Sequence, residues 1–157
     1  MYLQKLQKGD AMNNDTRLAV ATHILALLSF TERNYAPSEL LARSVHTNAV
    51  VVRRLISQLK KAGLVEVRRG LGGTILSHKP GDITLLDVYT AVVTKPTACP
   101  FYLHQNPNSQ CFVGRNIQDA LEIPFAKVNQ AIKESLAKTT VADIAAFIRK
   151  REFTQEE

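Results

Sequence analysis

The sequence predicts a mainly α-helical fold with one small β-hairpin. Apolar residues recur at helical spacing both before and after the middle of the chain. Polar capping residues separate the helical segments. The stretch VRRGLGGTIL, residues 67–76, favours a glycine turn between two short strands. With 157 residues, 45% of them hydrophobic, the chain is most simply one domain with a modest core.

The first helix is expected after a flexible extension over residues 1–13. Asn14 or Asp15 is suited to capping its start. The apolar stripe of this helix comprises Leu18, Ala21, Leu25 and Leu28. The pattern leaves open whether translation begins at Met1 or at Met12.

Two short helices follow in close succession. Pro37 and Ser38 mark the start of the first one. Its expected apolar face comprises Leu40, Leu41 and Val45. Thr47 or Asn48 is suited to capping the second helix, over residues 48–62. The apolar stripe of the second helix comprises Val52, Leu55, Ile56 and Leu59. Gly63 is a natural stop beyond its end.

The second of these helices and the hairpin after it are strongly basic. The basic residues over 48–79 are Arg53, Arg54, Lys60, Lys61, Arg68, Arg69 and Lys79, against one acidic residue, Glu66. A helix pair with a basic second helix, followed by a hairpin over 66–77, is the layout of a winged helix-turn-helix. We therefore expect residues 14–80 to bind DNA, with the second helix in the major groove and Arg68 and Arg69 at the wing. The simpler alternative is a solvated basic surface.

The remaining chain, residues 81–151, is expected to hold a loop and the dimerisation helices, before a flexible tail over 152–157. Thr84 with Asp87 starts one helix, and Thr140 with Asp143 starts the last. A long amphipathic helix lies between them, and Pro124 predicts a kink or break in it. Its stripe comprises Val113, Ile117, Leu121, Phe125, Val128, Ile132 and Leu136. A helix of roughly 40 Å outruns so small a core, which favours pairing with a second copy over packing within its own domain.

Most of the chain, from about residue 14 to 147, resembles one family. The segment SELLARSVHTNAVVVRRLISQLKKAGLVEVRRGLGG is similar to the DNA-binding part of the Rrf-two family of bacterial regulators, which includes IscR, NsrR and CymR. The resemblance continues through DITLLDVYTAV and HQNPNSQCFVG. It implies a homodimeric winged-helix transcription factor, usually a repressor, on a palindromic double-stranded DNA operator.

The resemblance also implies which residues contact DNA. The principal contacts are Asn48, Arg54 and Arg69, with Thr47, Val50 and Val51 at nearby reading positions. The other candidates in the helix and wing are Arg53, Ser57, Arg68, Gly70 and Gly72. The two valines stand where the iron–sulfur regulator has polar residues. They predict a different operator preference and are suited to contacting thymine methyl groups.

The signal that controls the regulator stays open. Cys99 and Cys111 match the first and third cysteine positions of the relatives that carry an iron–sulfur cluster, whereas Gln105 and Gly114 replace the middle cysteine and a histidine. A cluster normally takes four ligands, so no cofactor is expected. One alternative is a thiol switch at Cys111, which lies near a predicted helix N-terminus. The other is that both cysteines serve only as small apolar side chains. A zinc site that adds His104 matches no familiar spacing, so no metal is expected.

Other function classes find little support. The sequence has no nucleotide-binding glycine fingerprint, no H-E-x-x-H and no nucleophile elbow, so we do not expect an enzyme. It has no apolar run near the roughly 20 residues that span a bilayer, and its two cysteines suit a reducing cytoplasm. Two hypotheses follow: an operator-specific dimeric regulator, with redox state as one candidate signal, and a protein-interaction module that keeps a winged-helix scaffold without binding DNA. The sequence does not give the operator, the target genes, the inducer or the direction of regulation.

Overall fold

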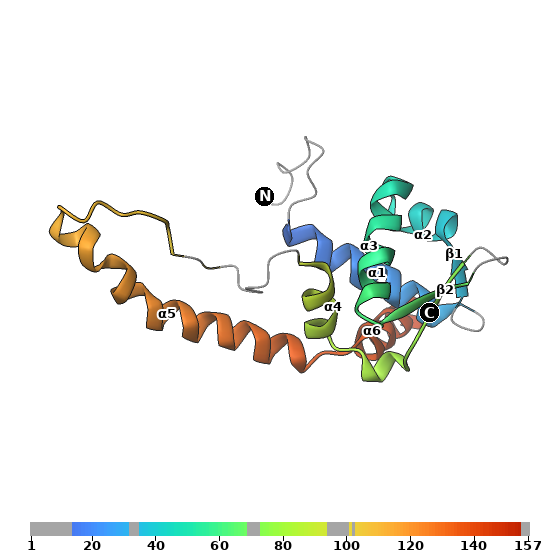
Figure 1. The fold of residues 1–157 in the computed structure, drawn as a ribbon. Coiled ribbons are helices and arrows are strands. Elements are labelled where there is room, and N and C mark those ends of the chain that lie inside the picture. Colours follow the sequence, from blue (N-terminus) through green and yellow to red (C-terminus); the bar gives the residue numbers. More distant parts are fainter. Residues whose placement is uncertain (1–13, 32–34, 69–72, 94–100, 102, 155–157) are drawn as a thin grey trace.

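The chain folds into a helical body from which one long helix projects (Figure 1). The computed structural model describes residues 14–31, 35–68, 73–93, 101 and 103–154. The helices are α1 (Asn14–Phe30), α2 (Ser38–Val45), α3 (Ala49–Lys61), η2 (Pro80–Asp82), α4 (Leu85–Val92), α5 (Phe112–Ala137) and α6 (Val141–Thr154). The strands are β1 (Tyr35–Pro37), β2 (Val65–Arg68) and β3 (Gly73–Leu76). The predicted fold class, mainly α with a small β-hairpin, is confirmed.

Helix α1 lies at the centre of the body. Ala21, Leu25 and Leu28 of its predicted stripe are buried, and Ile24 joins them in a core that α3 and α4 share. Asn14 and Asp15, the expected caps, both lie inside the helix. On α2 the prediction was wrong for Leu40, which is exposed, because Leu41 beside it is the residue that turns into the core.

The wing is anchored by a third strand that the sequence pattern did not predict. β1 pairs antiparallel with β3, which also pairs with β2, so the sheet order is β1-β3-β2. Pro37 is tolerated because β1 is an edge strand. Gly73 is buried, and a Cβ there would overlap the ring of Tyr35. A larger residue at the base of the wing would therefore require the Tyr35 ring to move.

Helices α4 and α6 complete the body. Thr84 with Asp87, and Thr140 with Asp143, make the predicted side-chain and backbone hydrogen bonds at the two helix starts. The core continues past residue 80 through Ile83, Val88, Val92 and Val141. The predicted boundary at residue 80 therefore does not divide the packing. Helix α6 also extends to Thr154, into the segment expected to be a flexible tail.

Helix α5 forms the projecting arm. It continues through Pro124, so of the predicted kink or break the break does not occur: proline removes only one backbone hydrogen bond from a helix of 26 residues. Residues of the preceding loop lie along it. Gln118 Nε2 donates to the carbonyl of His104 at 2.9 Å, and Asn129 Nδ2 donates to the carbonyl of Phe101 at 3.2 Å. The rings of Phe101 and Phe125 lie 5.8 Å apart, so the loop covers part of the apolar stripe.

Candidate nucleic-acid interface

The turn between α2 and α3 sets the direction of the candidate recognition helix. His46 adopts the left-handed conformation, with φ of 56° and ψ of 48°, and ends α2. Its N–H donates to the carbonyl of Arg43 at 3.2 Å, and that of Thr47 donates to the carbonyl of Ala42 at 3.3 Å. Two residues, Thr47 and Asn48, separate His46 from the start of α3 at Ala49, so α2 and α3 form the helix-turn-helix that the sequence predicts.

Asn48 caps α3. Its Oδ1 accepts a hydrogen bond from the N–H of Val50 at 2.8 Å, which confirms one of the two predicted caps. The side chain is exposed and stands at the N-terminal end of the helix. With Oδ1 engaged by the backbone, the Nδ2 group is the part of Asn48 that is suited to donating a hydrogen bond outward.

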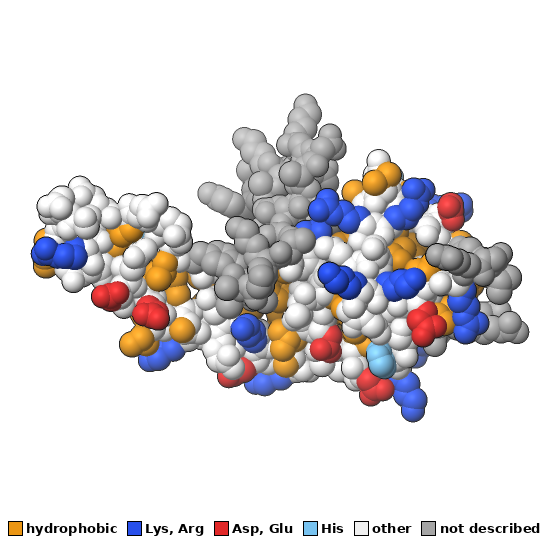
Figure 2. Space-filling view, in the orientation of Figure 1, with side chains coloured by type: hydrophobic (Ala, Val, Ile, Leu, Met, Phe, Trp, Pro, Cys, Tyr) orange, Lys and Arg blue, Asp and Glu red, His pale blue; other side chains and the backbone are white. Residues whose placement is uncertain are grey.

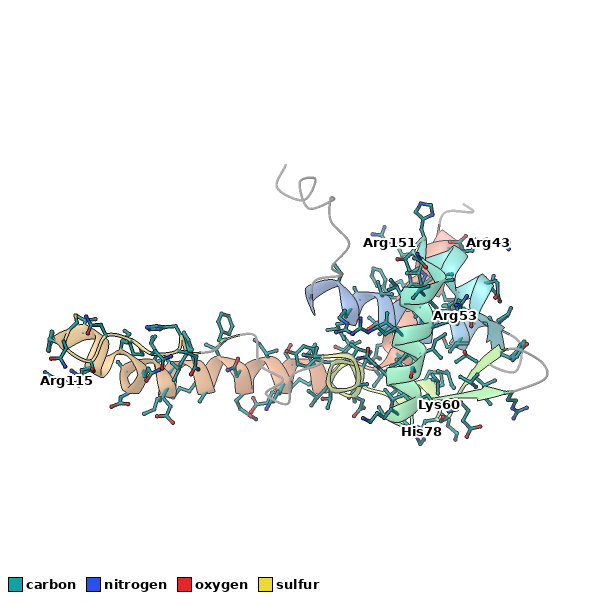
Figure 3. All side chains as sticks on the ribbon, turned by 45° about the horizontal axis from the view of Figure 1, so that its top comes forward. Arg43, Arg53, Lys60, His78, Arg115 and Arg151 are labelled. Atoms are coloured by element: carbon teal, nitrogen blue, oxygen red, sulfur yellow. The ribbon has the colours of Figure 1, made fainter. Side chains whose placement is uncertain are left out.

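The outer side of α3 carries an exposed set of cations, which we call the basic face: Arg53, Arg54, Lys60 and Lys61 of α3 with Arg68 of β2. Helix α3 has no acidic residue to offset them. Lys and Arg side chains gather over this region in Figure 2. Figure 3 places Arg53 and Lys60 along α3, and Arg115 at the far end of the α5 arm. The opposite side of α3 is buried through the predicted Val52, Leu55, Ile56 and Leu59.

The two valines at the start of α3 differ in exposure. Val50 is 64% exposed, which is high for a large apolar side chain, whereas Val51 is half-buried and packs against the core. Ser57 is exposed beside the basic face, and Thr47 is half-buried in the turn. Val50 and Ser57 are therefore the candidate uncharged contacts that the structure leaves open to an incoming ligand.

Sequence reasoning missed a contact beneath the basic face. The buried Arg17 of α1 donates from Nη2 to Oε1 of Gln58 on α3 at 3.1 Å. Burial lowers the pKa of the Arg17 guanidinium, and the charge of Arg54 lowers it further. Sequence spacing gave no signal for this pair, since the two residues lie 41 positions apart.

The wing is described only at its two strands. Arg68 is exposed at the end of β2 and pairs with Gly73 across the hairpin. The predicted contacts Arg69, Gly70 and Gly72 lie outside the described residues. The described part of the wing thus contributes one exposed arginine beside the face of α3.

Two of the candidate sensing residues, Cys111 and His104, lie at the far end of α5. Cys111 is exposed at the N-cap position of α5. Its side chain makes no capping hydrogen bond, yet the backbone N–H groups of Gly114 and Val113 lower the pKa of its thiol. His104 is exposed in the preceding loop, and Cys99 lies outside the described residues. The described residues contain no group of three or more His, Cys, Asp or Glu side chains placed to hold a metal.

The loop around Cys111 does not fit an iron–sulfur cluster. The family resemblance places Gly114 where the cluster-binding relatives have a histidine. A Cβ on Gly114 would overlap the backbone carbonyl of Asn108. The N–H of Cys111 donates to that same carbonyl at 3.1 Å. A side chain at 114 would have to displace the loop, and the chain has only two cysteines toward the four ligands of a cluster.

Within the described residues, no helix has the length and apolar character needed to cross a membrane.

Comparisons with known proteins agree with this geometry. Residues 14–146 match the model of the Rrf2 family, described as an iron-dependent transcriptional regulator. A relative from Bacillus subtilis (strain 168), named "Putative HTH-type transcriptional regulator YwnA", is 46% identical over 130 residues, which are 83% of this chain and 95% of that protein.

Solved structures agree as well. A crystal structure of "a putative DNA binding protein" is 44% identical, with a TM-score of 0.67 over 82% of this chain and 97% of that one. The structure of CymR (YrzC), the global cysteine regulator of B. subtilis, shares the fold at 20% identity, with a TM-score of 0.61 over 90% of this chain and 98% of that one. The chain therefore belongs to the Rrf2 family and is a DNA-binding transcriptional regulator, not an enzyme.

Proposed function

We propose that this regulator is a homodimeric repressor of a palindromic operator, with α3 in the major groove and the wing on the flanking backbone. The observation that carries the proposal is the outer side of α3, where Arg53, Arg54, Lys60 and Lys61 are all exposed without an acidic residue on the helix. Cations in this arrangement neutralise phosphates, and a helix of this width enters the major groove.

Base recognition is assigned to the N-terminal part of α3. Asn48 has its Nδ2 group left to donate, and Arg54 supplies a planar fork of donors suited to guanine. The exposed Val50 is suited to a thymine methyl group. Lys60, Lys61 and Arg68 are charged groups farther along the face and are assigned to the phosphates.

Dimerisation is assigned to α5. None of the described α5 side chains is buried, although the helix runs for 26 residues, or about 39 Å. The loop covers Phe125, but Val113 and Val128 of the same stripe remain exposed, and Val128 is 45% exposed. A second α5 that lies across this helix would cover those side chains and relate the two copies by a two-fold axis. Two recognition helices related in this way read half-sites about 34 Å apart, one turn of the duplex.

Repression follows from occupancy. A dimer that covers its operator excludes other proteins from the same duplex, and no catalytic step is required. The resemblance to the family implies this direction of regulation. A reporter gene behind the operator should be more strongly expressed in cells that lack the regulator.

Redox control is assigned to Cys111. Its thiol is exposed and its pKa is lowered, so a larger fraction is thiolate at neutral pH than for an ordinary cysteine. A hydroperoxide oxidises the thiolate to sulfenate by transferring one oxygen atom, and is itself reduced to the alcohol or water. The added oxygen stands at the start of α5, where it alters the loop that packs on this helix.

The test is a binding titration of the full chain against the DNA upstream of its own gene. We expect affinity to fall about 10³-fold or more between 50 and 200 mM salt if six or more phosphates are contacted. Mass measurement in solution should give two chains per particle for the free protein. The complex with DNA should contain one dimer per operator. Treatment of the wild-type protein with hydroperoxide should change DNA affinity, whereas a Cys111→Ser variant should not respond. A folded protein that binds no duplex at any salt would favour the interaction-module alternative instead.

A further inference from the structure

An apolar groove lies on the body, and its lining shares no residue with the basic face. It is formed by α1, the start of α4 and α6, and its volume is about 570 Å³. The lining residues are Leu18, Ala19, Thr22, His23, Ala26, Leu27, Phe30, Leu85, Ile144 and Ile148. The dimer, the operator contacts and the thiol described above use none of them.

We propose that this groove binds a small amphipathic organic anion, an apolar molecule with one acidic head group, and that its occupancy regulates DNA binding. The regulatory half of this inference rests on the proposed function, whereas the binding site does not.

The apolar lining of the groove favours a ligand with an apolar body. Among the described residues that line the groove, none carries a carboxylate, an ammonium or a guanidinium group, and Thr22 and His23 supply the polar side chains. Burial of apolar ligand surface there gains roughly 25 cal/mol per Å². The volume lies within the range of about 300–1,000 Å³ typical of small-molecule sites. A stable protein partner would need about 800 Å² on each side, which favours a small ligand.

One end of the groove, beside Phe30, offers a cation for the acidic head group of the ligand. The guanidinium of Arg149 on α6 lies 5.3 Å from the ring centroid of Phe30, one of the lining residues. Arg149 is exposed, so its charge is available at that end of the groove. An acidic head group beside Phe30 would meet a planar cation suited to carboxylate recognition.

A direct contact joins the groove to the helix-turn-helix. His23 lines the groove, and its Nε2 lies 3.0 Å from Oγ of Ser44 in the last turn of α2. Ala21, Leu25 and Leu28 of the same helix α1 pack in the core with the buried side of α3. A ligand that fits one placement of α1 better than another shifts the population of helix-turn-helix conformations by its difference in affinity.

The test uses the full-length protein and the fluorescent probe 1-anilinonaphthalene-8-sulfonate, which combines an apolar body with a sulfonate. We expect saturable binding of one probe per chain and displacement by decanoate. Decanol has the same chain length without the charge and should displace the probe at least about tenfold less well. The variant Arg149→Gln should weaken decanoate binding by a similar factor, whereas Arg151→Gln should not.

A second pair of variants localises the site. Ala19 is exposed and lines the groove, so Ala19→Phe should fill it and abolish probe binding. Ala146 is exposed on α6 outside the lining, and Ala146→Phe is the matched control that should bind the probe as the wild type does. Circular dichroism should show both variants folded. In the DNA titration, saturating decanoate should change operator affinity at least threefold in the wild type and not in Ala19→Phe.

Several outcomes would overturn the inference. Probe binding that survives in Ala19→Phe would show that the groove is not the binding site. Equal displacement by decanol and decanoate would show that the site has no preference for an anion. A wild type that binds no probe, together with dissociation of the Ala19→Phe dimer, would identify the groove as a contact between two copies. Probe binding without any effect on operator affinity would remove the regulatory half. A protein that binds the probe but no DNA would contradict the proposed function and leave the groove as a ligand site.

Discussion

Arg17 of α1 donates a hydrogen bond to Gln58 of α3, with 3.1 Å between Nη2 and Oε1. The bond fixes a buried cation directly beneath the helix that carries the basic face. Burial lowers the pKa of Arg17 first, and the positive charge of Arg54 adds to this effect. The positive charges of Arg54 and Arg17 therefore repel each other within the free protein.

Replacement of Arg54 by alanine should move stability and DNA affinity in opposite directions. The change removes a repulsion with Arg17, so the melting temperature should stay the same or rise slightly. The loss of a base or phosphate contact should weaken operator binding by about 1–3 kcal/mol. Thermal melts and DNA titrations of the same preparations measure both. A fall in melting temperature would mean that Arg54 supports the fold instead.

Two replacements of Asn48 should separate its capping role from DNA recognition. Asn48→Ala removes the acceptor for the N–H of Val50 and should cost about 1 kcal/mol of unfolding free energy. Asn48→Ser keeps a side-chain oxygen for the cap but loses the Nδ2 donor, so stability should change by only a few tenths of a kcal/mol. Both should lose base preference at one operator position. If Asn48→Ser reads every base as the wild type does, the amide has no role in recognition.

A lysine at the middle of α5 should separate the two copies. Val128 is 45% exposed on the stripe that we assign to the dimer, so Val128→Lys would place a charge in an apolar contact. Sedimentation should show single chains, and affinity for the full palindrome should fall at least about tenfold. Affinity for one half-site should not change. Gln130→Lys, on the opposite side of α5, is the matched control and should remain dimeric.

Histidine at position 114 should destabilise the loop without creating a metal site. The backbone carbonyl of Asn108 occupies the place of a Cβ on Gly114, so the larger side chain must displace residues 108–111. Overpacking of this kind costs about 1–3 kcal/mol. Melting temperature and iron content after anaerobic reconstitution are the measurements. Stoichiometric iron in Gly114→His would contradict our description of the loop.

Cys111 should react faster with iodoacetamide than an unfolded-chain cysteine at the same pH. The backbone N–H groups of Gly114 and Val113 lower the pKa of its thiol, which favours the thiolate. The rate plotted against pH should therefore have its midpoint below the ordinary value of a cysteine. Mass spectrometry after short labelling resolves Cys111 from Cys99. The same labelling in urea supplies the reference rate, and equal midpoints would refute the effect of the helix start.

Most of the fold was predictable from the sequence because its helices repeat a local pattern. Spacing at three and four residues identified Val52, Leu55, Ile56 and Leu59 as the buried side of α3, and T-x-x-D identified the starts of α4 and α6. These features depend on neighbours within a few residues. The exposed cations of α3 followed from the same periodicity, which is why the helix of the candidate site was predictable.

Features that depend on distant contacts were not predictable. Three residues, Tyr35–Pro37, are too short to show an alternating pattern, and β1 forms only because β3 supplies a partner. The bond from Arg17 to Gln58 and the carbonyl of Asn108 under Gly114 likewise depend on tertiary packing. Pro124 predicted a kink or a break, and the break does not occur because one missing backbone bond does not outweigh the rest of a long helix.

Strand β1 connects the wing to the helix-turn-helix. Pro37 pairs with Gly73 at the root of the wing and is also the residue that precedes α2. The wing and α2, the first helix of the helix-turn-helix, are thus joined at the same residue, Pro37. A tilt of the hairpin to follow a bent DNA groove would therefore also move α2, and through its turn α3, the helix to which we assign base recognition.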